Sequence, residues 1–283
     1  MSLSSSAVLV DLSLYVWTAN KTDKSETSKL NTSSGAIRNA AKVKKNLMAG
    51  TSLIKDVINF SATCRNWHHS VTTPWSTRGA RLLATSYFLD YKEEANKKRA
   101  RFEQLVTEVI ADYPNLLQTA ETNLGSLHNT SDYPPLDELR QKFGFSLVFS
   151  PVPESGDFRV DVGTKELEEL KEQYKADFNN RLQEAMKEPW ERLYKSLIHI
   201  SERLEESGGE DKKRYFESLI TNAQELCGML SHLNVLKDPQ LEAAKCEVER
   251  ALTGVDIADI RSSSFARITT KKKVDEILNK FEW

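Results

Sequence analysis

Apolar side chains recur every three or four positions along most of this chain, a spacing that predicts a mainly α-helical protein. The longest such segment runs from Thr164 to about Glu206 without glycine and predicts a helix roughly 60 Å long. A second segment, from Ala80 to Asn129, has a similar length and spacing. Because so long and narrow an apolar stripe needs a facing helix, we expect the two to form an elongated antiparallel coiled-coil helical hairpin.

A different pattern predicts a small antiparallel β element. Between Val8 and Val16 every second residue is apolar, which is typical of a strand with one buried face. Residues 145–162 have the composition of two strands joined by a loop with proline and glycine. Since a lone hairpin is marginal in water, we expect it to pair with the first strand or to pack on helices.

Shorter periodic segments predict the remaining elements. The polar stretch after Val16 predicts a loop or poorly ordered arm, and Pro114 is expected to break or kink the helix that contains it. We expect further helices at about 33–48, 51–67, 135–143 and 215–233, from Pro239 to about Thr253, and at the end of the chain.

These elements suggest four consecutive parts, which we expect to form one elongated domain. Their predicted bounds are 1–32 for the strand and polar arm, 33–163 for a helical segment plus β-hairpin, 164–254 for the long helix and a helical bundle, and 255–283 for a linker and C-terminal helix.

Composition narrows the class of protein. The chain has 283 residues, 39% of them hydrophobic, and can bury a sizeable core. Its apolar runs fall far short of the roughly 20 residues that cross a bilayer, and its first residues lack the basic region and continuous apolar block of a signal peptide. We therefore expect an intracellular protein. Three scattered cysteines without a CxxC pair predict neither a disulfide framework nor a zinc module.

Charge is distributed unevenly along the chain. Residues 1–110 carry 16 Lys and Arg against 9 Asp and Glu, whereas the remainder carries 23 against 32. Two explanations fit this asymmetry. Helices from the two parts could pack with matched charges, or the first part could present a basic face to an anion or nucleic acid.

No pattern of catalytic residues emerges. The chain lacks a GxSxG elbow, a phosphate-binding GxxxxGK[ST] loop and a dinucleotide-binding glycine motif. Cys64 and His68 are four apart and could share a helix face, but no second pair completes a metal site. We therefore expect no catalytic residues, no metal and no cofactor.

Two groups of residues are candidates for binding. Short basic runs could neutralise nucleic-acid phosphates, although such runs also occur on ordinary helices. Their members are Lys42, Lys44, Lys45, Lys97, Lys98, Arg99 and Arg101, with a further run at 271–273.

The second group lies in the stretch "HHSVTTPWSTRGARLL". Pro74 predicts the end of one helix, and Ser76 or Thr77 predicts the cap of the next, with Trp75 as a hydrophobic staple. Arg78 and Arg81 would then lie on adjoining helical turns and need an anionic partner, internal or external. Trp75, Arg78 and Arg81 form a candidate partner surface, unless the stretch is only a structural corner.

Several stretches together resemble one protein family. They are "LSLYVWTANK", "TTPWSTRGARLLATSYFLDY", "FGFSLVFSPVPESGDFRVDV", "PWERLYKSLIHISERL" and "RYFESLITNAQELCGMLSHLNVLKDPQLEAA". In this order they resemble an uncharacterised family encoded by tailed bacteriophages and prophages of Gram-negative bacteria, and they span nearly the whole chain. The resemblance assigns no activity. Because such proteins are sometimes encoded near a MoxR-like AAA+ ATPase and a von Willebrand A-type protein, it implies an adaptor or client of an ATPase, in the cytoplasm of an infected bacterium.

From these observations we expect a non-enzymatic protein that binds other macromolecules, with a protein partner from the host or the phage and no membrane. The long apolar seam predicts a homodimer. Two alternatives stay open. One is a nucleic-acid-associated protein of phage replication or recombination, and the other is an inhibitor of a host defence enzyme.

Overall fold

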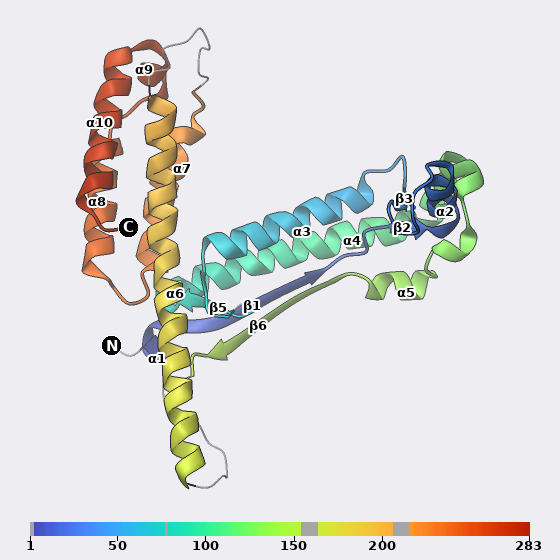
Figure 1. Ribbon diagram of the computed structural model, residues 1–283, viewed down its shortest axis with the longest axis horizontal. Coiled ribbons are helices and arrows are strands. Elements are labelled where there is room, and N and C mark those ends of the chain that lie inside the picture. The colour runs from blue at the N-terminus through green and yellow to red at the C-terminus, as the bar shows by residue number, and fades with distance from the viewer. Residues whose placement is uncertain (1–2, 77–78, 154–163, 206–214) are drawn as a thin grey trace. The chain divides into compact units, whose positions relative to one another are not determined.

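The computed structural model describes residues 3–76, 79–153, 164–205 and 215–283. It confirms a mainly helical chain with a small antiparallel sheet (Figure 1). The chain divides into two compact units, each built from segments far apart in the sequence. Unit 1 comprises Met1–Asp11, His69–Leu89 and Val148–Trp283, and unit 2 comprises Leu12–His68 and Asp90–Leu147.

The helices and strands follow one another along the chain. The strands are β1 (Ala7–Tyr15), β2 (Asn20–Asp23), β3 (Val43–Asn46), β4 (Thr73–Pro74), β5 (Arg81–Ala84) and β6 (Gly144–Pro151). The helices are α1 (Leu3–Ser6), α2 (Lys24–Ser33), α3 (Leu53–Ser70), α4 (Phe88–Leu124), α5 (Leu136–Gln141), α6 (Thr164–Leu204), α7 (Ser218–Leu233), α8 (Pro239–Leu252), α9 (Ile257–Ser262) and α10 (Ser264–Lys280), with short 3-10 turns at Thr85–Tyr87, Gly125–Leu127 and Thr130–Asp132.

The predicted first strand is confirmed as β1, a member of a sheet with the order β4-β5-β1-β6. Its antiparallel register with β5 pairs Ala7 with Ala84 and Val10 with Arg81. β6 confirms the first strand of the predicted 145–162 hairpin, whereas the second strand falls outside the described residues. β2 and β3 form a separate two-stranded sheet.

The core of unit 1 is a helical bundle. α6 packs against α7 and α10, and α8 packs against α7 and α10, as Figure 1 shows. The predicted seam of α6 is buried here at Leu193, Leu197, Ile200 and Leu204. Asp238 caps α8 through the Gln240 amide, and Pro239 occupies the first turn, where its missing N–H costs nothing.

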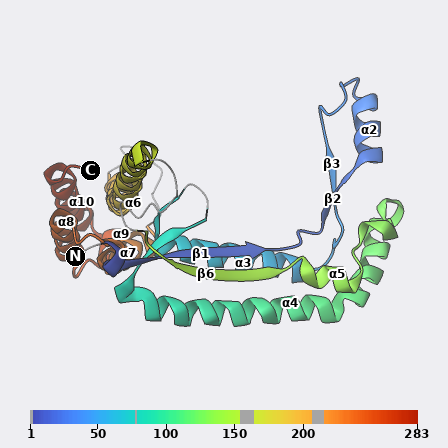
Figure 2. The same cartoon turned by 90° about the horizontal axis from the view of Figure 1, so that it is seen from below.

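The core of unit 2 forms around α3 and α4, which lie side by side in Figure 1. Figure 2 shows α4 running along the direction of β1 and β6. One face of α4 is buried at Phe102, Leu105, Val109, Tyr113 and Leu116, in a cluster with Ile54, Val57 and Cys64 of α3. Burial at every third or fourth residue explains why these segments are helical.

The expected coiled-coil hairpin between 80–129 and 164–206 is not confirmed. The apolar face of α4 packs on α3 and neighbouring segments of unit 2, and the seam of α6 packs on α7 and α10 of unit 1. A periodic stripe requires a facing partner, but several shorter elements can supply it together.

The predicted helix at 33–48 and the predicted unstructured arm before it are both wrong. α2 occupies 24–33, and 43–46 form β3. The Asp23 side chain caps α2, and Gly35 leaves it with a φ of +60°. The Asn31 side chain then bonds both backbone groups of Ala41, an arrangement that competes with helix formation there.

A helix starting at Ser76 or Thr77 is also wrong, because β5 occupies 81–84 and α4 begins at Phe88. Pairing with β1 and β4 supplies the backbone hydrogen bonds that a helix would have made. Pro114 does not break the helix that contains it, since α4 continues through this residue. Within the described ranges, no helix is long and apolar enough to span a membrane.

Candidate functional site

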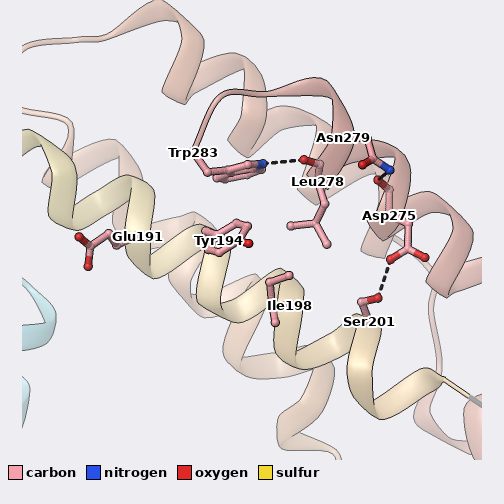
Figure 3. Close-up of a pocket in the computed structure, with 8 residues that line it drawn as sticks. All are labelled: Glu191, Tyr194, Ile198, Ser201, Asp275, Leu278, Asn279 and Trp283. Atoms are coloured by element: carbon pink, nitrogen blue, oxygen red, sulfur yellow. Dashed lines mark hydrogen bonds between the residues drawn. The ribbon is translucent and has the colours of Figure 1, made fainter.

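A groove runs between α6 and α10 in unit 1, as Figure 3 shows. Its cavity volume is about 760 Å³. The lining residues are Glu191, Tyr194, Ile198 and Ser201 of α6, Asp275, Leu278 and Asn279 of α10, and Trp283 beyond it. Tyr194, Ile198 and Ser201 are three and four residues apart and so share one face of α6, beside the buried seam.

Aromatic rings form one end of the groove. The Trp283 ring centroid lies 5.5 Å from that of Tyr194 and also 5.5 Å from that of Trp190. The Trp283 indole N–H donates to the Leu278 carbonyl at 2.8 Å, which fixes the ring over the groove (Figure 3). Tyr194 is 38% exposed, so this end offers aromatic surface to a ligand.

The other end is polar. The Ser201 hydroxyl lies 2.5 Å from Asp275 Oδ1 and donates to it, and Lys271 Nζ lies 2.7 Å from Oδ2. Burial acts to raise the pKa of the Asp275 carboxyl, but the hydrogen bonds from Lys271 and Ser201 outweigh it and lower that pKa below its ordinary value. A carboxylate held ionised is a weak base, so this arrangement does not activate Ser201 as a nucleophile.

Of the predicted partner surface, the structure describes Trp75 and Arg81, and both make contacts within unit 1. Trp75 is 5% exposed, and its ring meets Phe178 edge to face at a centroid distance of 5.2 Å. Arg81 belongs to β5 and not to a helix, and Arg78 lies outside the described residues. The expected staple at a helix start is therefore wrong, because α4 begins only at Phe88 and Trp75 packs in a second apolar cluster of unit 1, separate from the helical bundle.

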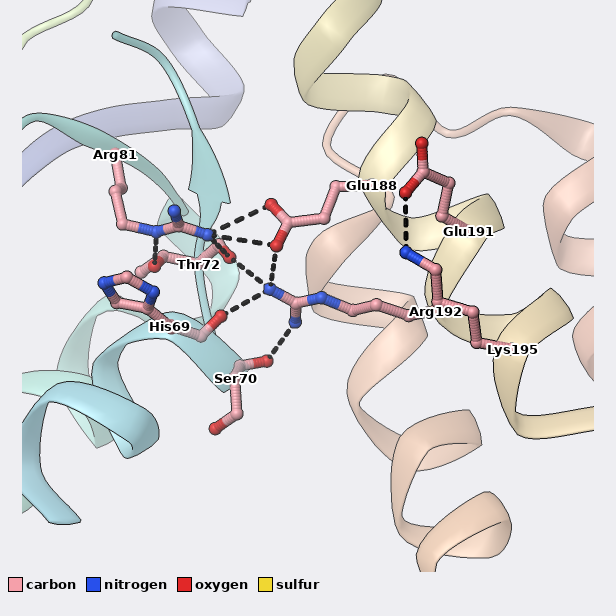
Figure 4. A network of polar contacts seen from close by, with 8 residues as sticks. All are labelled: His69, Ser70, Thr72, Arg81, Glu188, Glu191, Arg192 and Lys195. Atoms are coloured by element: carbon pink, nitrogen blue, oxygen red, sulfur yellow. Dashed lines mark hydrogen bonds and ion pairs between the residues drawn. The ribbon is translucent and has the colours of Figure 1, made fainter. Parts of the chain in front are cut away.

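Arg81 does have the anionic partner that its charge requires. Its Nη2 lies 3.0 Å from Glu188 Oε2, while Arg192 Nη2 lies 2.6 Å from Oε1 of the same carboxylate (Figure 4). Arg192 also donates to the carbonyls of Ser70 and Thr72. These bonds join the segment before β4 to α6.

Burial and electrostatics both act on this network. Burial lowers the pKa of the Arg81 guanidinium. Burial, followed by the positive charge of Arg81, also lowers the pKa of His69. Because both guanidinium groups donate to protein oxygens, the network is a structural tie between segments.

The basic candidates fall into two classes. Lys45 lies 2.6 Å from Asp132, and Lys97 and Lys98 form ion pairs with Glu93 and Glu94 one turn away. Arg99 lies over the Phe145 ring and Arg101 pairs with Glu108. By contrast, Lys42 and Lys44 are exposed and form no ion pair with any residue the structure describes.

Cys64 and His68 are both buried on α3, and burial raises the pKa of the Cys64 thiol. His68 Nδ1 lies 2.8 Å from the Tyr91 hydroxyl, which burial keeps protonated by raising its pKa. Across the described part of the chain, no three His, Cys, Asp or Glu side chains are placed to hold a metal ion.

Sequence reasoning missed the groove. Its residues flank the apolar seam of α6, where a tyrosine next to a buried leucine was the available signal. Comparisons of the chain with protein-family models, with curated proteins and with solved structures found no match. The function is therefore inferred from the surfaces of the chain itself.

Proposed function

We propose that the protein acts by binding another macromolecule and catalyses no reaction, with the groove between α6 and α10 as its contact surface. The observation that carries this proposal is the position of Tyr194, which is partly exposed and packs against Trp283 at one end of a cavity of about 760 Å³. Aromatic side chains at the edge of a concave surface dominate binding energy in many protein interfaces.

The chemistry of the groove favours a protein segment as the ligand. An apolar anchor side chain could insert beside Tyr194 and Ile198, and fully burying one such side chain contributes about 1.5–3 kcal/mol. Ser201 and Asp275 would flank it with polar groups that orient a backbone amide.

Affinity purification tests this proposal. Tagged wild-type protein, Tyr194→Ala and the exposed neighbour control Lys195→Ala are recovered from cells that produce the protein naturally, with and without nuclease. We expect one protein in near-stoichiometric amount with the wild type and the control, unaffected by nuclease and strongly reduced with Tyr194→Ala. Equal recovery of the partner with the wild type and both variants would show that the groove is not its contact surface. Recovery that depends on nucleic acid would favour nucleic-acid binding over protein binding as the function.

The wider setting remains a proposal that rests on resemblance. We place the protein in the cytoplasm of a phage-infected bacterium, as an adaptor that could serve an AAA+ ATPase. A mixture with purified MoxR-like ATPase, analysed by size-exclusion chromatography, tests that step. Separate elution of the two proteins at micromolar concentration would exclude the ATPase as a direct partner without affecting the groove.

Dimerisation is a separate proposal. The first half of α6 carries half-buried apolar residues at helical spacing, among them Leu167 and Leu170. A second copy could cover this stripe, as long apolar seams often self-pair. Sedimentation velocity should give a dimer, whereas a concentration-independent monomer would contradict the proposal.

A further inference from the structure

Residues 20–46 of unit 2 form a small module that we call the basic arm. It contains β2, α2 and β3, and Figure 2 shows these elements standing off from α3 and α4. Antiparallel pairing of β2 with β3 places Lys21 opposite Lys45 and Thr22 opposite Lys44. The Leu47 amide bonds the Ala19 carbonyl at 2.7 Å, and both residues are buried in the unit 2 core, so the arm has an anchored base.

The arm is strongly basic. It carries seven Lys and Arg residues against two acidic residues, a net charge of +5 in 27 positions, although the whole chain has a net charge of -2. Three of its lysines have partners in ion pairs, namely Lys21, Lys29 and Lys45. The other basic residues are exposed and form no ion pair with any described residue, and they are Lys24, Arg38, Lys42 and Lys44.

Strand geometry separates the two classes of lysine. Side chains alternate across a strand, so Lys44 points to the face opposite that of Lys45, which is buried against Asp132. Lys42, two residues before Lys44, follows the same alternation where the chain enters β3. The arm thus uses one face for internal ion pairs and leaves positive charge on the other.

The arm has few internal contacts that would offset the repulsion within this concentration of charge. Its buried residues are the polar Asn31 and Lys45, and it has no apolar core of its own. Ile37, in the loop between α2 and β3, is 82% exposed. Unneutralised like charges destabilise a compact element, so a polyanionic partner would stabilise this one.

Three features point to duplex DNA among polyanions. The arm contains no Phe, Trp or Tyr, and so lacks the stacking surface with which proteins hold single strands. A two-stranded β-ribbon fits the major groove of B-form DNA, which is about 12 Å wide. The deep, narrow major groove of A-form RNA does not admit such an element.

We infer that the basic arm binds the phosphate backbone of double-stranded DNA through Lys24, Arg38, Lys42 and Lys44. This surface is independent of the α6–α10 groove and of its protein partner. Because the contacts are to phosphates, binding is insensitive to sequence and strongly dependent on salt.

Fluorescence anisotropy with a labelled duplex of mixed sequence tests the inference. Four phosphate contacts predict that log K falls with log salt concentration with a slope of about -3 to -4. For Lys42→Ala/Lys44→Ala we expect weaker binding, with a Kd severalfold larger and a slope smaller in magnitude by about 2. Lys42→Arg/Lys44→Arg keeps both charges and should bind as the wild type does.

The matched control is Lys272→Ala/Lys273→Ala, which removes the same charge from two exposed residues of α10. It should leave the Kd and the slope unchanged, and circular dichroism should show that every variant is folded. No duplex binding at about 50 mM salt would overturn the inference. So would equal losses in the control, or tighter binding to single strands, to duplex RNA or to anionic vesicles than to duplex DNA.

Discussion

The Ser201 hydroxyl and the Asp275 carboxylate form a 2.5 Å hydrogen bond that joins α6 to α10 at the polar end of the groove. Lys271 completes this contact, with its Nζ 3.2 Å from the Ser201 oxygen. The bond fixes the spacing of the two helices whose outer faces form the groove, so the geometry of the groove depends on it.

Replacement of Ser201 should loosen this contact. We expect Ser201→Ala to lower the free energy of unfolding by about 0.5–1.5 kcal/mol, because the lost hydrogen bond goes to a carboxylate that is 35% exposed and that Lys271 continues to neutralise. Urea unfolding followed by circular dichroism measures the change. A variant as stable as the wild type would show that packing alone sets the helix spacing.

The same contact should depend on pH. The pKa of Asp275 is lowered in the folded state, so its stabilising effect is fully present above its ordinary pKa and is lost as pH falls through the folded value. The stability difference between wild type and Asp275→Asn should therefore be constant near neutral pH and shrink below about pH 4. Thermal melts across this range would contradict the assignment if the difference stayed constant down to about pH 2.

Glu188 should stabilise the folded protein more than Glu191, which lies three residues further along α6. Glu188→Gln leaves the Arg81 and Arg192 guanidinium groups without their shared carboxylate. We expect the free energy of unfolding to fall by about 1–3 kcal/mol. Glu191→Gln is the control, because its ion pair with Lys195 is mostly exposed and should contribute less than about 1 kcal/mol. Chemical denaturation measures the free energy of unfolding of both variants. Equal losses would mean that the Glu188 network contributes no more stability than an exposed ion pair does.

Lys45 should stabilise the basic arm from within. Its hydrogen bond with Asp132 raises the pKa of the Lys45 ammonium, and its side chain is 8% exposed. Lys45→Met keeps most of the volume but leaves a buried carboxylate short of a partner, so we expect a loss of about 3–5 kcal/mol.

Lys44→Met is the natural comparison for that substitution. Lys44 lies on the opposite face of β3 and is exposed, so the substitution should change the free energy of unfolding by no more than about 0.5 kcal/mol. Hydrogen exchange of the β2 and β3 amides would localise the effect to the arm. Similar protection in both variants would contradict the division of the arm into a paired and an unpaired face.

Sequence periodicity predicts the long helix α6 well, the bounds of α4 less well, and the packing partners of both helices poorly. The stripe through Leu193 and Leu197 marks a buried helix face wherever its partner lies, and so α6 was found within two residues of its observed end. What covers that stripe depends on contacts distant in sequence. Periodicity alone could not show that α7 and α10 do so.

Local pattern failed where side chains or sheet pairing replaced helical hydrogen bonds. The alanine-rich stretch after Gly35 has helical spacing, but the Asn31 side chain bonds both backbone groups of Ala41, and the stretch forms turns and bends. The segment at Arg81 looked helical because its pairing with β1 is invisible in local sequence. Lys42 and Lys44 could be singled out as basic, whereas only the structure separates them from the buried Lys45.

Site-specific photo-crosslinking tests most directly whether the groove between α6 and α10 contacts a protein partner. A photoreactive phenylalanine analogue replaces Tyr194 in one variant and His199, an exposed α6 residue outside the groove lining, in the other. After irradiation of cells that produce each variant, we expect one discrete crosslinked protein at position 194 and none at 199. Crosslinks of equal yield at both positions, or none at 194, would contradict the proposed contact.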